Sequence, residues 1–504
     1  MHHLLFLLSC NDGQKPATAD NSSVISAPQF VRIEAGDDEE TILAKATQVR
    51  PSERQLRWQQ LELTGFIHFG INTFTGREWG DGTEDPNIFN PTELDARQWA
   101  QSCKDAGIKQ LILTAKHHDG FCLWPSAYTE HSVKNSPWKD GKGDVVKELA
   151  EACEELGLGF GVYLSPWDRN AEFFGDSAKY NDYFINQLTE LLTNYGPIQE
   201  VWFDGANGEG PDGKKQVYDF DRWYNHIRKL QPDAVIAVMG PDVRWVGTET
   251  GYGRETEWSV LPGDALLPAT IAENSQKLDG FAPTNLMDDD LGSREKINKA
   301  KSLVWYPAET DVSIRPGWFY HKEEDSLVKS PEKLLDIYFS SVGRNGVLLL
   351  NMPPDTRGLI HENDVRNLRE WKQLRDRLFS QNLLKSAEWS GDGLSFAALA
   401  DGLDNTSWKL EQKQKNYTVE MKFTSPVTTN VFALQENIRE GQRVEKFRVE
   451  YLKNGEWLKL VEGTTIGYKR LLRFDAVTTN GLRLVIEESR AIPVLSELGA
   501  YLHP

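Results

Sequence analysis

The chain has 504 residues, more than one hydrophobic core usually organises, so we expect at least two domains. A composition of 39% hydrophobic and 26% charged residues is typical of a folded globular protein and excludes a disordered one. The formal net charge of −19 argues against nucleic acid or an anionic membrane surface as a partner and suits a neutral, soluble substrate. The 16 tryptophans suit a sugar-binding protein, because sugar faces stack on indole rings, although core packing also uses them.

Residues 1–50 are predicted to be a leader followed by a polar, irregular tether. The apolar run 4–8 is too short to span a bilayer, and with Ser9 and Cys10 it resembles a truncated secretion signal with a bacterial lipobox. We therefore expect an exported protein, periplasmic or on the bacterial cell surface, with Cys10 as a lipid anchor. A disordered start or a misassigned start codon is the alternative, since no Lys or Arg precedes the run. Cys103, Cys122 and Cys153 form no CxxC pair and are predicted to be core thiols.

From residue 51 to about 380, strand and helix patterns alternate, which favours a parallel sheet. Strands are predicted at 64–70, 109–120, 158–168, 198–205, 233–240 and 346–354. Helices are predicted at 91–107, 143–157, 176–196, 219–231 and 332–343, followed by a connecting helix at about 361–380. Thr92 is the expected N-cap of the first of these helices, and Gly107 its end.

The fold class that follows is α/β, an irregular (β/α)8-like barrel. Short turns lead from helix to strand and long loops follow each strand, so the active site is expected at the carboxyl ends of the strands. A doubly wound sheet is the alternative, but no glycine-rich phosphate fingerprint follows the first strand. Residues 255–335 fit the alternation poorly and predict an irregular part of the barrel.

Residues 381–504 change to short alternating apolar runs, which predict an all-β sandwich. The segment "ADGLDNTSW" at 400–408 resembles the opening of discoidin-like, carbohydrate-binding jelly rolls. Such a module either buttresses the barrel or binds sugar, and buttressing is the preferred interpretation.

Polar and aromatic side chains gather at consecutive predicted strand ends. In the strand at 198–205, Trp202 and Asp204 share one face while Val201 and Phe203 point toward the helices. The preceding strands end with His68, with His117 and His118, and with Tyr163 and Trp167. Each residue alone fits a structural role, but together they indicate a pocket that hydrogen-bonds sugar hydroxyls. A zinc site is the alternative, although no HExxH-like spacing is present and adjacent histidines on a strand cannot readily share one ion.

The ordered motifs "HFGINTFTGREWGDG", "AKHHDGFCLWPS", "YLSPWD", "VWFDGANGEG" and "GRNGVLLLNMPPDTRGLI" resemble the α-L-fucosidases of glycoside hydrolase family 29, over residues 54–360. The resemblance implies a (β/α)8-like barrel with a C-terminal β-sandwich and retaining hydrolysis with neither metal nor cofactor. It also implies that Asp204 is the nucleophile that forms a covalent fucosyl-enzyme. The positions that match fucose-binding residues of the family are His68, Glu78, Trp79, His117, His118, Tyr163 and Trp202.

The acid/base catalyst is sought in "RWVGTETGYGRETEWSV", which holds Glu249, Glu255 and Glu257. This segment resembles the subfamily acting on α-1,3/1,4-fucosyl linkages, whose acid/base follows a "WVG" turn, and so implies Glu249. Charge pairing with Arg244 or Arg254 is the alternative role for the other two glutamates. Trp318 resembles a further ring beside the sugar methyl, or else is an ordinary buried tryptophan.

The predicted function is a retaining exo-α-L-fucosidase that removes terminal α-1,3/1,4-linked fucose from an oligosaccharide or glycoconjugate. A catalytically inactive protein that binds fucosylated glycans is the alternative from a different class, and the intact Asp204 argues against it. A metal hydrolase built on the histidines is the third hypothesis, which a strong chelator would test.

Overall fold

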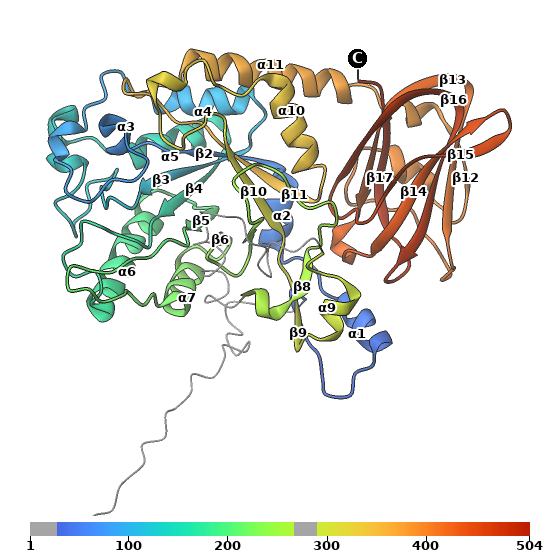
Figure 1. Ribbon diagram of the computed structural model, residues 1–504, viewed down its shortest axis with the longest axis horizontal. Helices are drawn as coiled ribbons and strands as arrows, with labels where there is room; N and C mark the ends of the chain where they lie inside the picture. Colours follow the sequence, from blue (N-terminus) through green and yellow to red (C-terminus); the bar gives the residue numbers. More distant parts are fainter. Residues whose placement is uncertain (1–27, 267–289, 504) are drawn as a thin grey trace, which may run out of the picture.

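The computed structural model describes residues 28–266 and 290–503, so the lipidation expected at Cys10 lies outside the described residues. Two units lie side by side along the long axis of the molecule: a helix-covered barrel, and a smaller unit of strands that ends near the C-terminus (Figure 1). Within the described ranges, no helix has both the length and the hydropathy required to cross a membrane.

Eight parallel strands form a nearly closed barrel, in the order β6-β5-β4-β3-β2-β11-β10-β7. An isolated parallel bridge between Ala237 and Val243 joins β6 to the chain just before β7. The barrel predicted from the alternation is therefore confirmed, and the doubly wound sheet is not formed. The strands are β2 (Leu63–Ile67), β3 (Gln110–Lys116), β4 (Gly159–Leu164), β5 (Glu200–Phe203), β6 (Val235–Val238), β7 (Arg244–Trp245), β10 (Ala308–Ser313) and β11 (Gly346–Asn351).

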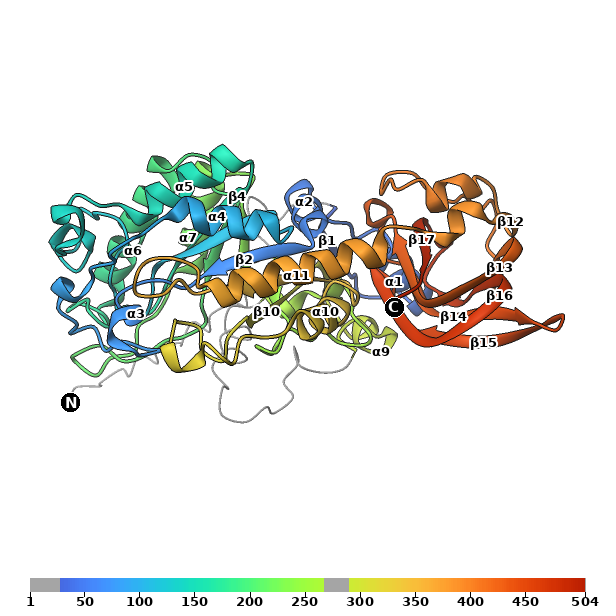
Figure 2. The same ribbon diagram turned by 90° about the horizontal axis from the view of Figure 1, so that it is seen from above.

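Helices connect most successive strands and cover the outside of the barrel (Figure 2). They are α4 (Ala96–Asp105), α5 (Val145–Leu156), α6 (Ser177–Asn194), α7 (Phe220–Leu230) and α10 (Pro331–Ser340), with α2 (Glu53–Leu61) before β2, the short α3 (Asn72–Thr75) after it, and α11 (Glu362–Phe379) after β11. The predicted N-cap Thr92 is wrong: Asp95 caps α4 by accepting the Gln98 amide. The helix starts later because the amides of Glu93 and Asp95 bond to the carbonyls of the loop at residues 357–358.

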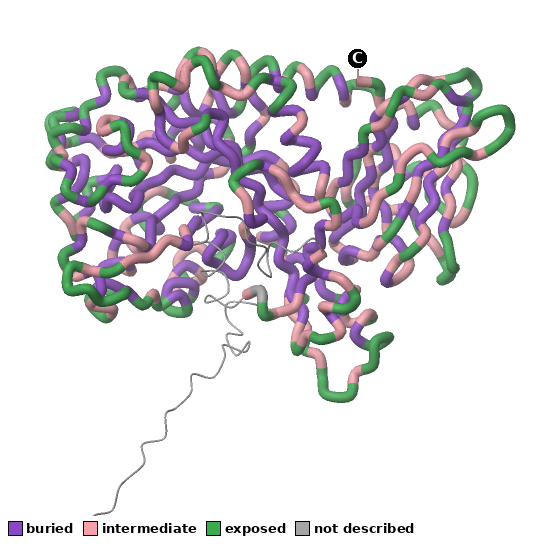
Figure 3. The backbone as a smooth tube through the Cα atoms, in the orientation of Figure 1, coloured by how far each residue is buried: buried purple, intermediate pink, exposed green. Residues whose placement is uncertain are grey.

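Alternate side chains of the barrel strands serve two different cores. Val201 and Phe203 lie in the large core between strands and helices. Trp202 faces the barrel interior, where it packs with Phe66 and Tyr163. The face assignment predicted for this strand is thus confirmed, and Figure 3 shows the strands of the barrel as almost continuously buried. Cys103, Cys122 and Cys153 are buried free thiols, as predicted.

The irregular region joins the N-terminal segment in a small layer of its own. β1 (Phe30–Arg32), β9 (Ser302–Trp305) and β8 (Val260–Pro262) form a three-stranded antiparallel sheet. α1 (Glu39–Ala46) packs beside α9 (Arg294–Asn298). The expectation of an irregular tether up to residue 50 is therefore wrong for its described part. Ile42, Ala46 and Val49 recur at helical spacing and are buried against this layer, which gives the segment a reason to fold.

The C-terminal unit is an antiparallel β-domain with its own core. Its strands are β12 (Glu388–Gly391), β13 (Tyr417–Glu436), β14 (Val444–Lys453), β15 (Glu456–Gly463), β16 (Arg470–Ser489) and β17 (Leu495–Tyr501). The long β13 pairs with β12 through its first half and with β17 through its second, with register shifts between the two halves. Backbone hydrogen bonds from Asn345 to Lys469 and from Leu471 to Gly343 attach it to the barrel.

Candidate active site

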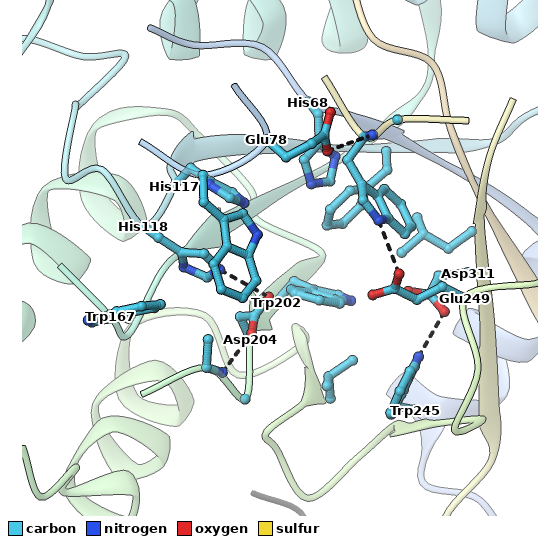
Figure 4. A pocket seen from close by; sticks show the side chains of 18 of the residues that line it. His68, Glu78, His117, His118, Trp167, Trp202, Asp204, Trp245, Glu249 and Asp311 are labelled. Atoms are coloured by element: carbon cyan, nitrogen blue, oxygen red, sulfur yellow. Dashed lines mark hydrogen bonds and ion pairs between the residues drawn. The ribbon is translucent and has the colours of Figure 1, made fainter. Parts of the chain in front are cut away.

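A cavity of about 640 Å³ opens at the carboxyl ends of the barrel strands (Figure 4). Its lining combines carboxylates, imidazoles and aromatic rings from strands that are far apart in the sequence. The polar and aromatic side chains among the lining residues are Phe66, His68, Glu78, Trp79, His117, His118, Trp167, Trp202, Asp204, Asn207, Trp245, Glu249, Asp311 and Trp318. Of the ten predicted site residues, all but Tyr163 line this cavity, and Tyr163 is buried directly beside it, with its hydroxyl on Asp204.

Asp204 is the first residue after β5, where the strand delivers its carboxylate to the cavity. The Ala206 amide donates to Oδ1 at 2.7 Å, and the Tyr163 hydroxyl donates to Oδ2 at 3.3 Å. The side chain is 29% exposed, and His118 Nε2 lies 3.9 Å from Oδ2. Burial raises the pKa of the carboxyl above its ordinary value, and the donated hydrogen bonds oppose only part of that rise. The carboxyl group is held in place by these bonds, with one oxygen edge open to the cavity.

The three histidines come from two neighbouring strands and form one polar wall. The His68 and His117 ring centroids lie 5.8 Å apart, and those of His117 and His118 lie 4.2 Å apart. Burial lowers the pKa of all three imidazoles, and the proximity of the other imidazoles lowers it further. The pKa of His118 falls to about 3. The wall is therefore made of neutral imidazoles near neutral pH.

The tautomers of two of these rings follow from their partners. His68 Nδ1 lies 2.9 Å from Asn351 Oδ1, an oxygen that can only accept, so Nδ1 carries the proton. His118 Nδ1 lies 2.8 Å from Ser165 Oγ, whose own hydrogen is donated to the Trp167 carbonyl. Nδ1 of His118 is therefore a donor as well. In both rings Nε2 remains as an acceptor, the role needed to receive a hydrogen bond from a sugar hydroxyl.

Aromatic rings enclose the space beside Asp204. Trp202 forms the floor, with its ring centroid 5.0 Å from those of both Phe66 and Tyr163. Trp79 stands at the mouth with 47% of its surface exposed, edge-on to His118 and Trp167 at 5.4 and 5.8 Å. An exposed indole beside hydrogen-bonding imidazoles is the kind of surface that a sugar ring can cover.

Glu249 lies on the loop after β7, across the cavity from Asp204 in the view of Figure 4. Trp318 Nε1 donates to its Oε2 at 3.3 Å. The surrounding walls raise the pKa of this carboxyl by removing water, and the charges of Asp204 and Glu78 raise it further. Glu249 therefore favours the protonated form more than an ordinary glutamate does.

The other two acid/base candidates do not line the cavity. Glu257 is buried and ion-paired with both Arg244 and Arg254, the pairing that was the alternative expectation. Glu255 pairs with Arg344 and Arg470 at the junction with the β-domain. Both carboxylates are thereby committed to holding the chain in place.

Glu78 lines the cavity, but its oxygens are occupied by the loop that carries Trp318. It accepts the amides of Trp318 and Phe319 at 2.9 and 3.2 Å, and His321 Nε2 lies 2.6 Å away. Its first effect is thus to position the Trp318 loop against the site.

Sequence reasoning missed Asp311 and Trp245, as well as the lining residues Phe66 and Asn207. Trp245 Nε1 donates to Asp311 Oδ1 at 2.8 Å, and Figure 4 shows the Asp311 carboxyl beside that of Glu249. Burial and the neighbouring Glu249 charge raise the pKa of Asp311 well above its ordinary value. The available signal was the pair Glu309 and Asp311, spaced by two in "AETDVS", which marks one face of a strand. Among the described residues, no group of three His, Cys, Asp or Glu is arranged to hold a metal ion.

Comparison with known proteins agrees with this geometry. The family described as Alpha-L-fucosidase matches residues 45–373, and the F5/8 type C domain matches residues 381–498. The chain is 46% identical to Alpha-L-fucosidase 1 of Arabidopsis thaliana, over 90% of this chain and 87% of that protein. A glycoside hydrolase 29 family member from an unknown rumen bacterium is 44% identical, with a TM-score of 0.76 over 90% of this chain and 77% of that one. A GH29 fucosidase from Ruminococcus gnavus, solved in complex with fucose, is 31% identical, with a TM-score of 0.78 over 94% and 97% of the two chains. The chain belongs to the α-L-fucosidases of glycoside hydrolase family 29.

Proposed function

We propose that this α-L-fucosidase removes terminal α-1,3/1,4-linked fucose from glycans with retention of configuration, using Asp204 as nucleophile and Glu249 as acid/base. The observation that carries the proposal is the placement of these two carboxyl groups in one cavity, with a wall of neutral imidazoles beside Asp204. Retaining glycosidases need two such groups about 5–5.5 Å apart.

In the first step, an Asp204 oxygen attacks the anomeric carbon of fucose while Glu249 gives its proton to the departing glycosidic oxygen. In the second step, the Glu249 carboxylate takes a proton from water, and the hydroxide oxygen displaces Asp204 from the sugar. The raised pKa of Glu249 supports its role as the acid, since the group must hold a proton at the pH of the reaction. The two hydrogen bonds donated to Asp204 hold its carboxyl group in place and favour the ionised form against the burial that raises its pKa, which supports its role as the nucleophile.

Sugar recognition is assigned to His68, His117, His118 and Tyr163 for the hydroxyl groups, and to Trp79, Trp202 and Trp318 for the apolar face and the methyl group. The acceptor Nε2 atoms deduced for His68 and His118 support this assignment. The fucose complex of the Ruminococcus gnavus relative supports fucose as the ligand of the equivalent cavity here.

The linkage preference rests on the "WVG" turn before Glu249 and is the part most open to experiment. The purified chain should be incubated with matched α-1,2-, α-1,3-, α-1,4- and α-1,6-linked fucosyl oligosaccharides, and free fucose measured over time. Release from the 1,3- and 1,4-linked compounds ahead of the others is the expected result. Preferential release from the 1,2- or 1,6-linked compounds would refute the linkage assignment but leave the fucosidase activity intact.

We also propose that the chain is exported and acylated at Cys10. Metabolic labelling with a fatty-acid analogue in a bacterial host should label the full chain and fail to label Cys10→Ser. Equal labelling of the wild type and Cys10→Ser, or labelling of neither, would refute the proposed lipid anchor.

A further inference from the structure

Two carboxyl groups are buried inside the barrel beneath the substrate cavity, and the catalytic proposal uses neither. Glu200 lies on β5 and Glu309 on β10, with exposed fractions of 0% and 1%. Whereas the buried carboxylates Glu257 and Asp364 are each paired with an arginine, neither Glu200 nor Glu309 is in an ion pair with a described cation. Two adjacent negative charges at such a site would be strongly unfavourable.

The hydrogen bonds of this pair use only one oxygen of each group. Glu200 Oε2 accepts Trp58 Nε1 at 3.1 Å and Gln110 Nε2 at 2.6 Å. Glu309 Oε1 accepts Trp202 Nε1 at 2.8 Å. The remaining oxygens, Glu200 Oε1 and Glu309 Oε2, are buried and no donor among the described residues reaches them. The two carboxyl groups lie close enough for the charge of one to act on the other, and a proton between the two unpartnered oxygens would give both of them a partner.

We propose that Glu200 and Glu309 share one proton, and that the singly protonated pair positions Trp202 at the floor of the substrate cavity. The proton sits on Glu309 Oε2 and is donated to Glu200 Oε1, because Glu200 receives two further N–H groups and is the better carboxylate. Glu309 Oε1 is then left to accept the Trp202 indole. All four oxygens have partners in this arrangement.

The charges around the pair agree with retention of the proton. The groups that act on it are Asp242 on the Glu200 side and Asp311 on the Glu309 side, both of which are acidic. Asp242 is itself neutralised by Arg54 and Arg228, and Arg244 of the neighbouring β7 is engaged by Glu257. Burial raises the pKa of Glu200 to about 7 and that of Glu309 well above its ordinary range.

This makes Glu200 and Glu309 positioning residues that act on the sugar through Trp202. The role rests on the proposed function in that Trp202 must contact fucose. The positioning role can be tested apart from the proposed function, because neither carboxyl group reaches the cavity.

Glu309→Gln and Glu309→Leu distinguish the shared proton from simple packing. Glutamine reproduces the protonated acid: its N–H₂ donates to Glu200 and its oxygen accepts Trp202. We expect Glu309→Gln to keep KM for an aryl fucoside and Kd for fucose within about twofold. Glu309→Leu leaves the indole without its acceptor, and we expect both constants to rise about tenfold, with a smaller change in kcat. An equal rise of KM and Kd in both variants, or no rise in Glu309→Leu, would refute the positioning role.

Glu436→Leu is the matched control, since Glu436 is also a buried glutamate, 1% exposed, but holds backbone amides of the β-domain. It should reduce stability and leave KM and Kd unchanged. A rise in KM in this variant as well would show that general loosening explains the effect.

The shared proton has two readouts that do not depend on catalysis. A difference infrared spectrum, wild type minus Glu309→Gln, should contain the carbonyl stretch of a protonated carboxylic acid at neutral pH. In addition, the wild-type folded state holds a proton on Glu309 that the unfolded chain releases as pH rises past about 4.5, so its stability falls from that pH upward until the raised pKa of Glu309 in the folded state is passed. Relative to wild type, Glu309→Gln should therefore gain up to about tenfold in its folding equilibrium constant per pH unit. Absence of the stretch, or parallel pH profiles, would contradict the shared proton even if fucose binding behaves as proposed.

Discussion

Replacing Glu249 with glutamine should separate substrates by how much they need a proton donor. The leaving group of an oligosaccharide is a sugar alkoxide, which must be protonated as the bond breaks, whereas an acidic phenol departs without help. General acid catalysis contributes about 10²–10⁴-fold, and the carboxyl groups that neighbour Glu249 in the described part of the cavity already have partners. Asp311 is buried and bonded to Trp245, while Glu78 is occupied by the Trp318 loop. We therefore expect a loss of about 10³-fold in kcat/KM on a fucosylated oligosaccharide.

On an aryl fucoside with an acidic phenol, the same variant should lose less than about tenfold in the fucosylation step. The assay is a series of aryl fucosides of graded phenol acidity, with the oligosaccharide as the least acidic member. Glu255→Gln is the matched control, because Glu255 is 66% exposed and pairs with Arg470 away from the cavity. This control should keep kcat/KM within about twofold of wild type on every substrate. A uniform loss across the series for Glu249→Gln, or a graded loss for Glu255→Gln, would refute the assignment of Glu249.

Four further outcomes are expected. Asp204→Ala should abolish turnover of aryl fucosides while keeping the unfolding transition of the wild type. Near-full activity of this variant would refute the assignment of Asp204 as the nucleophile. The pH profile of kcat/KM should fall on the alkaline side as Glu249 loses its proton, at a pKa raised above 4.5. Glu249→Gln should not show this alkaline fall; if it does, a group other than Glu249 causes it. Asp311→Asn should keep kcat/KM within about threefold of wild type, because Asp311 is held in its neutral form and the amide oxygen can still accept Trp245 Nε1. A loss in kcat/KM comparable to that of Glu249→Gln would give Asp311 a direct catalytic role. A strong chelator should leave turnover unchanged, whereas inactivation reversed by a divalent metal would revive the metal-hydrolase hypothesis.

Much of the architecture could be predicted from local pattern. Strands such as β3 and β5 show the buried runs and period-two alternation of barrel strands, and helices such as α5 show an apolar stripe with a terminal glycine. These signals are local, and tertiary contacts reinforce them. The N-cap of α4 was mispredicted because the contact that displaces it comes from residues 357–358, more than 250 positions away.

The N-terminal segment was mispredicted for a related reason. α1 has a weakly apolar sequence and gains its stability from burial of Ile42 and Ala46 against residues of a distant part of the chain. Its short strand partner, β1, pairs with β9 some 270 residues later. The helical spacing of Ile42, Ala46 and Val49 is the one local signal of this fold, and the residues that they pack against lie far away in the sequence.

The polar members of the site were predictable where they ended a recognisable strand. His68, His117 and Asp204 follow strands with clear apolar patterns, so their convergence at one edge followed from the parallel topology. Asp311 and Trp245 lie on β10 and β7, in the region where the alternation is interrupted. The contact between Asp311 and Trp245 depends on the pairing of β10 with β7, and the interior pair of Glu200 and Glu309 depends on the closure of the barrel, which turns the inner faces of β5 and β10 toward each other. That information is not contained in any one segment.

The central claim is that Asp204 becomes covalently bonded to the sugar during turnover. Because Glu249→Gln slows the second step, in which water must be activated, this variant should accumulate the intermediate on an activated aryl fucoside. Rapid acid quenching, proteolysis and mass spectrometry would then locate the bound fucosyl group. We predict that it lies on the peptide that contains Asp204, and on the Asp204 side chain itself. A fucosyl group on Asp311 or on any residue other than Asp204, or an unlabelled enzyme that still releases the phenol in a burst, would contradict the account.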